Sequence, residues 1–151
     1  MLRDDINKAL TAAMKGGDKL RVSTLRLINS ALKNADIEAR GHGKGPLGDD
    51  ELLGLLQKMI KQRQESIELY EKGGRAELAA QEREEIGIIA AYLPQQMSDA
   101  EMRAAVEAAV TETGAGAMKD MGKVMAALKA RHAGKMDFAK ASGLVKARLA
   151  G

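Results

Sequence analysis

Apolar residues recur every three or four positions along most of the chain, which is the spacing of one face of an α-helix. The clearest stripe passes through Val22, Leu25, Ile28 and Leu32 and predicts a helix over residues 19–40. Good helix formers dominate and β-branched residues are sparse, so the chain is predicted to be all-α. Further helices are predicted over 2–15, 49–72, 75–92 and 99–113, then from near Met118, and finally after Asp137.

The segment from Tyr92 to Ser98 holds both a stop signal and a start signal for a helix. Pro94 has no amide proton and disfavours helical geometry at Leu93, so one helix should end near Tyr92. Ser98 and Glu101 have the spacing of a capping box, which begins the next helix. We therefore predict two helical subdomains: residues 1–93 form a bundle of long helices, and residues 94–151 form a small three-helix-type bundle. Leu93 and Pro94 are the expected hinge.

Charged residues interrupt the apolar stripes of three helices. Arg21 and Arg63 each lie on an apolar side, and Glu82 does so in the fourth helix, close to Glu85. A desolvated arginine needs a carboxylate or carbonyl partner, so structural ion pairs among these residues are expected. Paired carboxylates also suit acid–base catalysis, but no nucleophile motif accompanies them. No catalytic residue is assigned.

Composition narrows the classes of protein. The 151 residues contain no cysteine, and Phe138, Tyr70 and Tyr92 are the only aromatic residues, which disfavours a base-stacking surface. His42 has no second His or Cys at metal-ligand spacing, and no zinc pattern or nucleotide fingerprint appears, so neither a metal nor a cofactor is expected. No signal peptide or membrane span is recognised, so we expect a cytoplasmic protein without membrane contact.

The net charge of +3 is unevenly distributed. Residues 1–48 carry +4, residues 49–114 carry −7 and residues 115–151 carry +6. A basic segment beside an acidic one indicates either a footprint for nucleic acid or two surfaces that pair internally.

Two groups of cations are candidate phosphate contacts. One is a row with heptad spacing on the second helix, comprising Lys19, Arg26, Lys33 and Arg40. The row stays on one flank over roughly 30 Å and either tracks a phosphate backbone or is simply solvated. The other group lies in the tail and comprises Lys119, Lys123, Lys129, Arg131, Lys135, Lys140 and Lys146.

Four segments in order resemble the GatB/YqeY family, and in particular its small stand-alone YqeY-like members. They are residues 21–28, residues 57–66, the stretch from Glu85 to Gln96, and residues 121–125 followed by 134–137. The resemblance implies two all-α subdomains. It also implies a tail similar to that of the B subunit of the glutamine-dependent aspartyl/glutamyl-tRNA amidotransferase, where this tail engages tRNA and chemistry resides in other domains.

Three functions remain open. The first is a non-catalytic module that binds tRNA or another structured RNA by duplex shape and phosphate contacts. The second is a protein-interaction adaptor with a protein partner. The third is a component of carbon–nitrogen ligase activity with glutamine as amido donor, a role that the family resemblance alone suggests.

Overall fold

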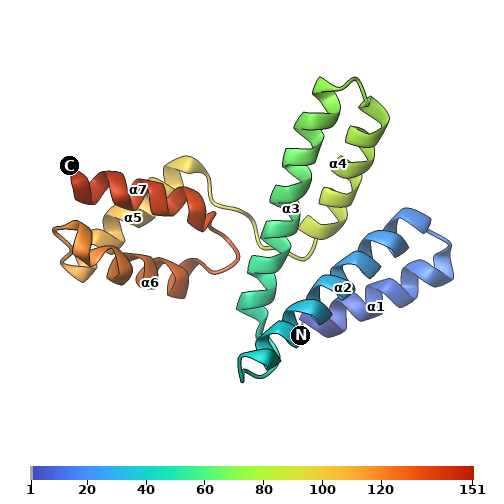
Figure 1. Ribbon diagram of the computed structural model, residues 1–151, viewed down its shortest axis with the longest axis horizontal. Coiled ribbons are helices and arrows are strands. Elements are labelled where there is room, and N and C mark those ends of the chain that lie inside the picture. The colour runs from blue at the N-terminus through green and yellow to red at the C-terminus, as the bar shows by residue number, and fades with distance from the viewer. Residues whose placement is uncertain (1) are drawn as a thin grey trace. The chain divides into compact units, whose positions relative to one another are not determined.

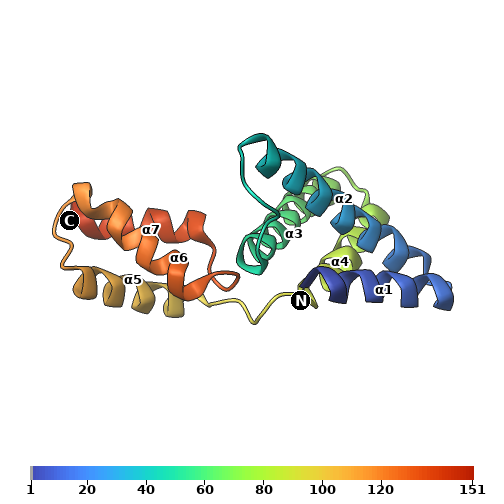
Figure 2. The same cartoon turned by 90° about the horizontal axis from the view of Figure 1, so that it is seen from below.

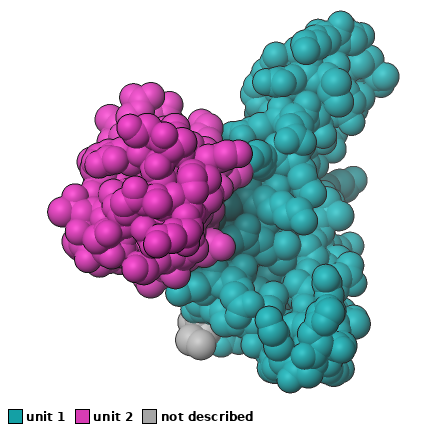
Figure 3. Space-filling view, turned by 60° about the vertical axis from the view of Figure 1, so that its left-hand side comes forward, with its two compact units in different colours: residues 1–94 teal, residues 95–151 magenta. Residues whose placement is uncertain are grey.

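A computed structural model describes residues 2–151, which form helices joined by turns and short loops, without strands in that range. The prediction of an all-α protein is confirmed. The chain divides into two compact units, residues 1–94 and 95–151, shown in different colours in Figure 3. The proline that marked the predicted boundary is therefore the last residue of unit 1.

Unit 1 consists of two antiparallel helical hairpins (Figure 1). The first pairs α1 (Leu2–Gly16) with α2 (Lys19–Gly41), and the second pairs α3 (Asp49–Lys72) with α4 (Ala76–Ala90). Each hairpin turns at a glycine with positive φ, Gly17 and Gly74, a conformation that a side chain makes costly. Asp18 caps α2, since its side chain accepts a hydrogen bond from the Arg21 amide at 3.1 Å.

The core of unit 1 draws apolar side chains from all four helices. Its fully buried members are Ile6, Leu25, Ile28, Leu52, Leu56 and Ile89. The fourth helix buries Ala79, Glu85, Ile88 and Ile89, and it ends at Ala90 rather than at Tyr92, the predicted end. Tyr92 and Leu93 still pack against this core, beyond the end of the helix.

Unit 2 contains three helices and one short 3-10 turn. Helices α6 (Met121–His132) and α7 (Phe138–Ala150) lie together on one side of α5 (Asp99–Thr113), as Figure 2 shows, and the turn η1 (Met118–Asp120) precedes α6. The predicted capping box is confirmed: the Glu101 amide donates to Ser98 Oγ at 3.1 Å, and the Ser98 amide donates to Glu101 Oε1 at 3.0 Å. The α6 helix begins three residues later than the sequence predicts, so Met118 lies on the surface.

The core of unit 2 is separate from that of unit 1 and depends on a few aliphatic side chains. Those least exposed are Met102, Val106, Ala109, Val124, Leu128, Met136, Ala141 and Val145. Two backbone-directed contacts join the segment before α5 to the loop before α7. The Met97 amide donates to the Lys135 carbonyl at 2.8 Å, and Gln96 Nε2 donates to the Gly134 carbonyl at 2.7 Å.

Candidate functional site

The predicted row of cations lies along the outer surface of α2. Lys19, Arg26, Lys33 and Arg40 are all exposed. Within residues 2–151, none of the four takes part in an ion pair. The four side chains are therefore open to an external anion, while the Arg40 charge also acts on Asp36 and lowers the pKa of that carboxyl. The heptad spacing distributes the four charges over roughly 30 Å.

A clamp between α1 and α2 lies beside this row, and the sequence patterns did not reveal it. Arg3 binds Asp36 through two guanidinium nitrogens, Nη1 to Oδ2 and Nη2 to Oδ1, each at 2.6 Å. Arg3 Nη2 also donates to the Leu47 carbonyl at 3.1 Å, and the Leu47 amide donates to Asp36 Oδ1 at 3.1 Å. The hydrogen bonds from Arg3, and then that from Leu47, hold the pKa of Asp36 below its usual value.

This clamp fixes the position of the cation row relative to α1. It also ties down the end of the glycine-rich segment 41–48, because both members of the clamp bind the Leu47 backbone. An open hollow of about 300 Å³ adjoins the clamp and is lined by Arg3, Asn7, Asn29, Leu32, Lys33 and Asp36. Lys33 thus belongs both to the cation row and to a concave surface with amide and guanidinium donors.

The tail cations are exposed, but several of them are paired with carboxylates of the same unit. Lys123 lies 4.0 Å from Asp120, and Lys140 lies 3.7 Å from Asp99. Arg131 pairs with Glu112. Among the described residues, the members of the predicted tail group that form no ion pair are Lys119, Lys129, Lys135 and Lys146.

The positive charge of the tail is therefore partly neutralised by acidic side chains of the same unit. Helix α5 brings acidic side chains to α6 and α7, so residues 95–151 carry nine basic and six acidic side chains, a net +3. Arg148 shows the same effect, since its Nε lies 2.7 Å from Glu107 Oε1. The α2 row is consequently the more continuous cationic surface.

Arg63, Glu82 and Glu85 meet at the interface between α3 and α4. Arg63 Nε donates to Glu85 Oε2 at 3.0 Å and lies 3.7 Å from Glu82 Oε2, while Nη1 donates to the Met59 carbonyl at 3.3 Å. The exposed fraction of the side chain is 14% for Arg63, 20% for Glu82 and 10% for Glu85. Glu82 Oε2 is buried without a hydrogen-bond partner in the described residues.

Arg21 does not join this cluster, although the acidic residues of the fourth helix were its expected partners. It lies in the first turn of α2, where Arg21 Nε is 3.4 Å from Asp18 Oδ2 and the side chain is 46% exposed. Its angular position is that of the apolar stripe, but the end of the helix is open to solvent. Leu93 and Pro94 are half-buried, and the hinge proposed there stays a prediction.

The cluster makes a pH-dependent contribution to stability. Burial raises the pKa of Glu82, and the nearby Glu85 carboxylate raises it further against the opposing effect of Arg63. A carboxyl whose pKa is raised on folding stabilises the folded state below its unfolded pKa, and this contribution is lost as pH rises through the folded pKa. We expect Glu82→Gln to remove the effect, so that the stability of the wild-type protein relative to the variant declines from about pH 4.5 upward.

Urea unfolding of both proteins over a pH series measures this difference. Glu77→Gln is a matched control, since Glu77 is on the same helix and is 69% exposed. Parallel curves for the wild-type protein and Glu82→Gln would show that Glu82 does not titrate differently on folding.

Two other classes of site find no support in residues 2–151. No group of three or more histidine, cysteine or acidic side chains is placed to hold a metal ion. No helix there combines the length and the apolar character needed to cross a bilayer.

Two all-α units, one with an exposed row of cations on α2, define the class as an all-helical protein. The model of the family described as Yqey-like protein matches residues 3–149. The chain belongs to this family, and the family resemblance seen in its sequence is thereby confirmed.

Curated relatives share the name "Altered inheritance of mitochondria protein 41, mitochondrial". The relative from Lachancea thermotolerans is 39% identical over 110 residues, which cover 72% of this chain and 57% of the relative. That from Vanderwaltozyma polyspora is 35% identical over 88 residues, 58% of this chain and 46% of the relative. That from Eremothecium gossypii is 33% identical over 92 residues, 61% of this chain and 46% of the relative. The chain spans about half the length of the curated relatives it matches.

These names contradict the expected cytoplasmic location, since each describes a mitochondrial protein. The physical reason for the error is plain. A highly charged helical composition suits any aqueous compartment, including the interior of an organelle, so composition does not separate the cytosol from other compartments.

Proposed function

We propose that this YqeY-family protein binds structured RNA, tRNA included, through the cation row of α2. The observation that carries the proposal is the row itself, in which four exposed cations at heptad spacing form no ion pair within the described residues. Contacts of this kind neutralise phosphates and release counterions, which gives affinity without reading sequence.

The adjacent hollow supports the same proposal. Amide side chains at Asn7 and Asn29, linked by a hydrogen bond of 3.1 Å, lie beside Lys33. Side-chain amides donate to phosphate and sugar oxygens, and the 2′-hydroxyl is the group that distinguishes RNA. Lys119, Lys129, Lys135 and Lys146 of unit 2 are further phosphate contacts, made independently of the row. Recognition rests on backbone shape, since the chain is poor in aromatic residues.

The test is the salt dependence of binding to bulk tRNA. Each phosphate neutralised on a duplex contributes about 0.9 to the slope of log affinity against log salt. The double variant Arg26→Gln/Lys33→Gln should therefore flatten the slope by about 1.8 and weaken binding at low salt. Fluorescence anisotropy with labelled tRNA measures both quantities.

A matched control removes the same charge from paired side chains. In Arg131→Gln/Arg148→Gln the lost cations already have Glu112 and Glu107 as partners. This control should change the slope less than the row variant does. Equal slopes for the two variants, or no binding by the wild-type protein at low salt, would rule out the α2 row as an RNA surface.

A further inference from the structure

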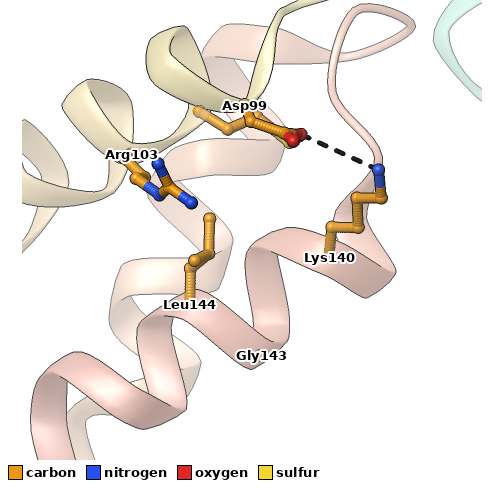
Figure 4. Close-up of a pocket in the computed structure, with 6 residues that line it drawn as sticks. Asp99, Arg103, Lys140, Gly143 and Leu144 are labelled. Atoms are coloured by element: carbon orange, nitrogen blue, oxygen red, sulfur yellow. Dashed lines mark ion pairs between the residues drawn. The ribbon is translucent and has the colours of Figure 1, made fainter.

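A groove in unit 2 runs between the first half of α5 and the first half of α7. It has a volume of about 330 Å³ and is lined by Asp99, Met102, Arg103, Lys140, Gly143 and Leu144. Figure 4 shows Asp99 and Arg103 reaching in from α5, and Lys140 and Leu144 from α7. The α2 cation row lies on the other unit, and none of the proposed phosphate contacts of unit 2 lines the groove.

The floor of the groove is aliphatic. Met102 is 3% exposed and belongs to the core of unit 2, and the half-buried Leu144 packs against that core. Gly143 contributes no side chain, and a Cβ added there would have no heavy atom within 4 Å. A ligand can therefore approach the α7 backbone closely and rest an apolar group mainly on the half-buried Leu144, with the adaptable side chain of Met102 beneath it.

The rim of the groove carries an excess of positive charge. Lys140 Nζ lies 3.7 Å from Asp99 Oδ1, and the two side chains are 63% and 68% exposed, so this pair is loose and open to exchange. Arg103 is exposed and has no ion-pair partner among the described residues. One of the two cations is thus uncompensated, and arginine is among the residues that contribute most at protein interfaces.

The geometry points to a protein partner: we propose that the groove docks an acidic amphipathic helix, with a leucine-type side chain on the floor and glutamates on Arg103 and Lys140. A volume near the lower end of the range of about 300–1,000 Å³ for ligand pockets suits one or two side chains. Apolar anchors at helical spacing are how such a segment occupies a groove between helices. A nucleotide base fits less well, because the groove offers no aromatic ring for stacking.

The probe is a short acetylated and amidated peptide in which leucines recur at i, i+4 and glutamates fill the flanking positions. It is added to the full chain carrying ¹³C-labelled methionine and leucine methyl groups. We expect concentration-dependent shifts of the Met102 and Leu144 methyl resonances. A peptide with lysine in place of every glutamate should bind at least tenfold more weakly.

Glycine substitutions test the groove without removing a contact of the fold. Gly143→Leu places a side chain in the groove and replaces glycine with a better helix former, so unit 2 should remain folded. It should weaken peptide binding at least tenfold. Gly122→Leu on α6 is the matched control, since a Cβ at Gly122 also has no heavy atom within 4 Å and Gly122 does not line the groove. This control variant should bind the peptide as the wild-type protein does.

Charge reversal gives a second measurement that does not depend on filling the groove. The Arg103→Glu variant should no longer bind the glutamate peptide, and it should bind the lysine peptide more tightly than the wild-type protein does. The proposal is overturned if the glutamate peptide leaves the Met102 and Leu144 methyl groups unshifted, if Gly143→Leu and Gly122→Leu behave alike, or if guanosine monophosphate shifts these methyl groups and the peptide does not. None of these results bears on the salt dependence of tRNA binding, so the two proposals fail separately.

Discussion

Replacing Arg63 with alanine is expected to lower the free energy of unfolding of unit 1 by about 3 kcal/mol, the lower end of the range for breaking a buried ion pair. The Arg63 side chain is only 14% exposed and bonds Glu85 and the Met59 carbonyl. Its loss leaves two carboxylates close together at the α3–α4 interface with no cation between them. The lower end applies because Glu82 and Glu85 keep 20% and 10% exposure.

Urea unfolding followed by circular dichroism measures this loss, and the same interface provides the control. Arg83 on α4 pairs with Glu71 on α3, and both side chains are about half exposed. Since an exposed pair contributes about 0–1 kcal/mol, Arg83→Ala should have little effect. A triple apolar replacement, Arg63→Met/Glu82→Leu/Glu85→Leu, should recover much of the stability. Equal losses for Arg63→Ala and Arg83→Ala would contradict the role assigned to the cluster.

This cluster could be predicted from the sequence because Arg63 and Glu82 occupy positions on the apolar sides of their helices. A charge on the apolar side of a helix has to find a partner, so residues that break the stripe indicate contacts between helices. Arg63 pairs with Glu82 and Glu85 as expected, whereas Arg21 pairs with Asp18 and not with the acidic residues of the fourth helix. Helical periodicity gives only the angle of a side chain about its axis, and at the end of a helix that angle does not decide burial.

The Arg3–Asp36 clamp shows what periodicity leaves out. Arg3 and Asp36 are separated by 33 residues and lie on different helices, and neither interrupts a long apolar run. Their contact depends on how α1 folds back along α2, which local patterns do not specify. The glycine-rich segment 41–48 shows the same limit, because its composition does not reveal that the Leu47 backbone is held by both members of the clamp.

Charge counted along the chain also differed from charge on the surface. The tail is strongly basic as a linear segment, but α5 belongs to the same unit and supplies Glu107 and Glu112 to its arginines. The α2 row is an exposed cationic surface in the structure, as its spacing in the sequence indicates, because all its members lie on a single helix. A property carried by one helix was therefore predictable, and a property shared among three packed helices was not.

Unit 2 depends on a small core, and Leu128→Ala is expected to destabilise it by about 2–5 kcal/mol. Leu128 is fully buried on α6 and belongs to the cluster that joins α5, α6 and α7. A domain of about 60 residues has little stability to spare, so a loss of this size should unfold much of residues 95–151 at 25 °C.

Amide hydrogen exchange resolved by residue is the measurement, because it reports on α5, α6 and α7 separately from the helices of unit 1. In Leu128→Ala, protection should collapse throughout these three helices. Leu128→Met is the matched control: it conserves volume and should cost less than about 1.5 kcal/mol, which leaves protection in place. Retained protection of α5 and α7 in Leu128→Ala would mean that Leu128 does not hold the three helices together as one cooperative core.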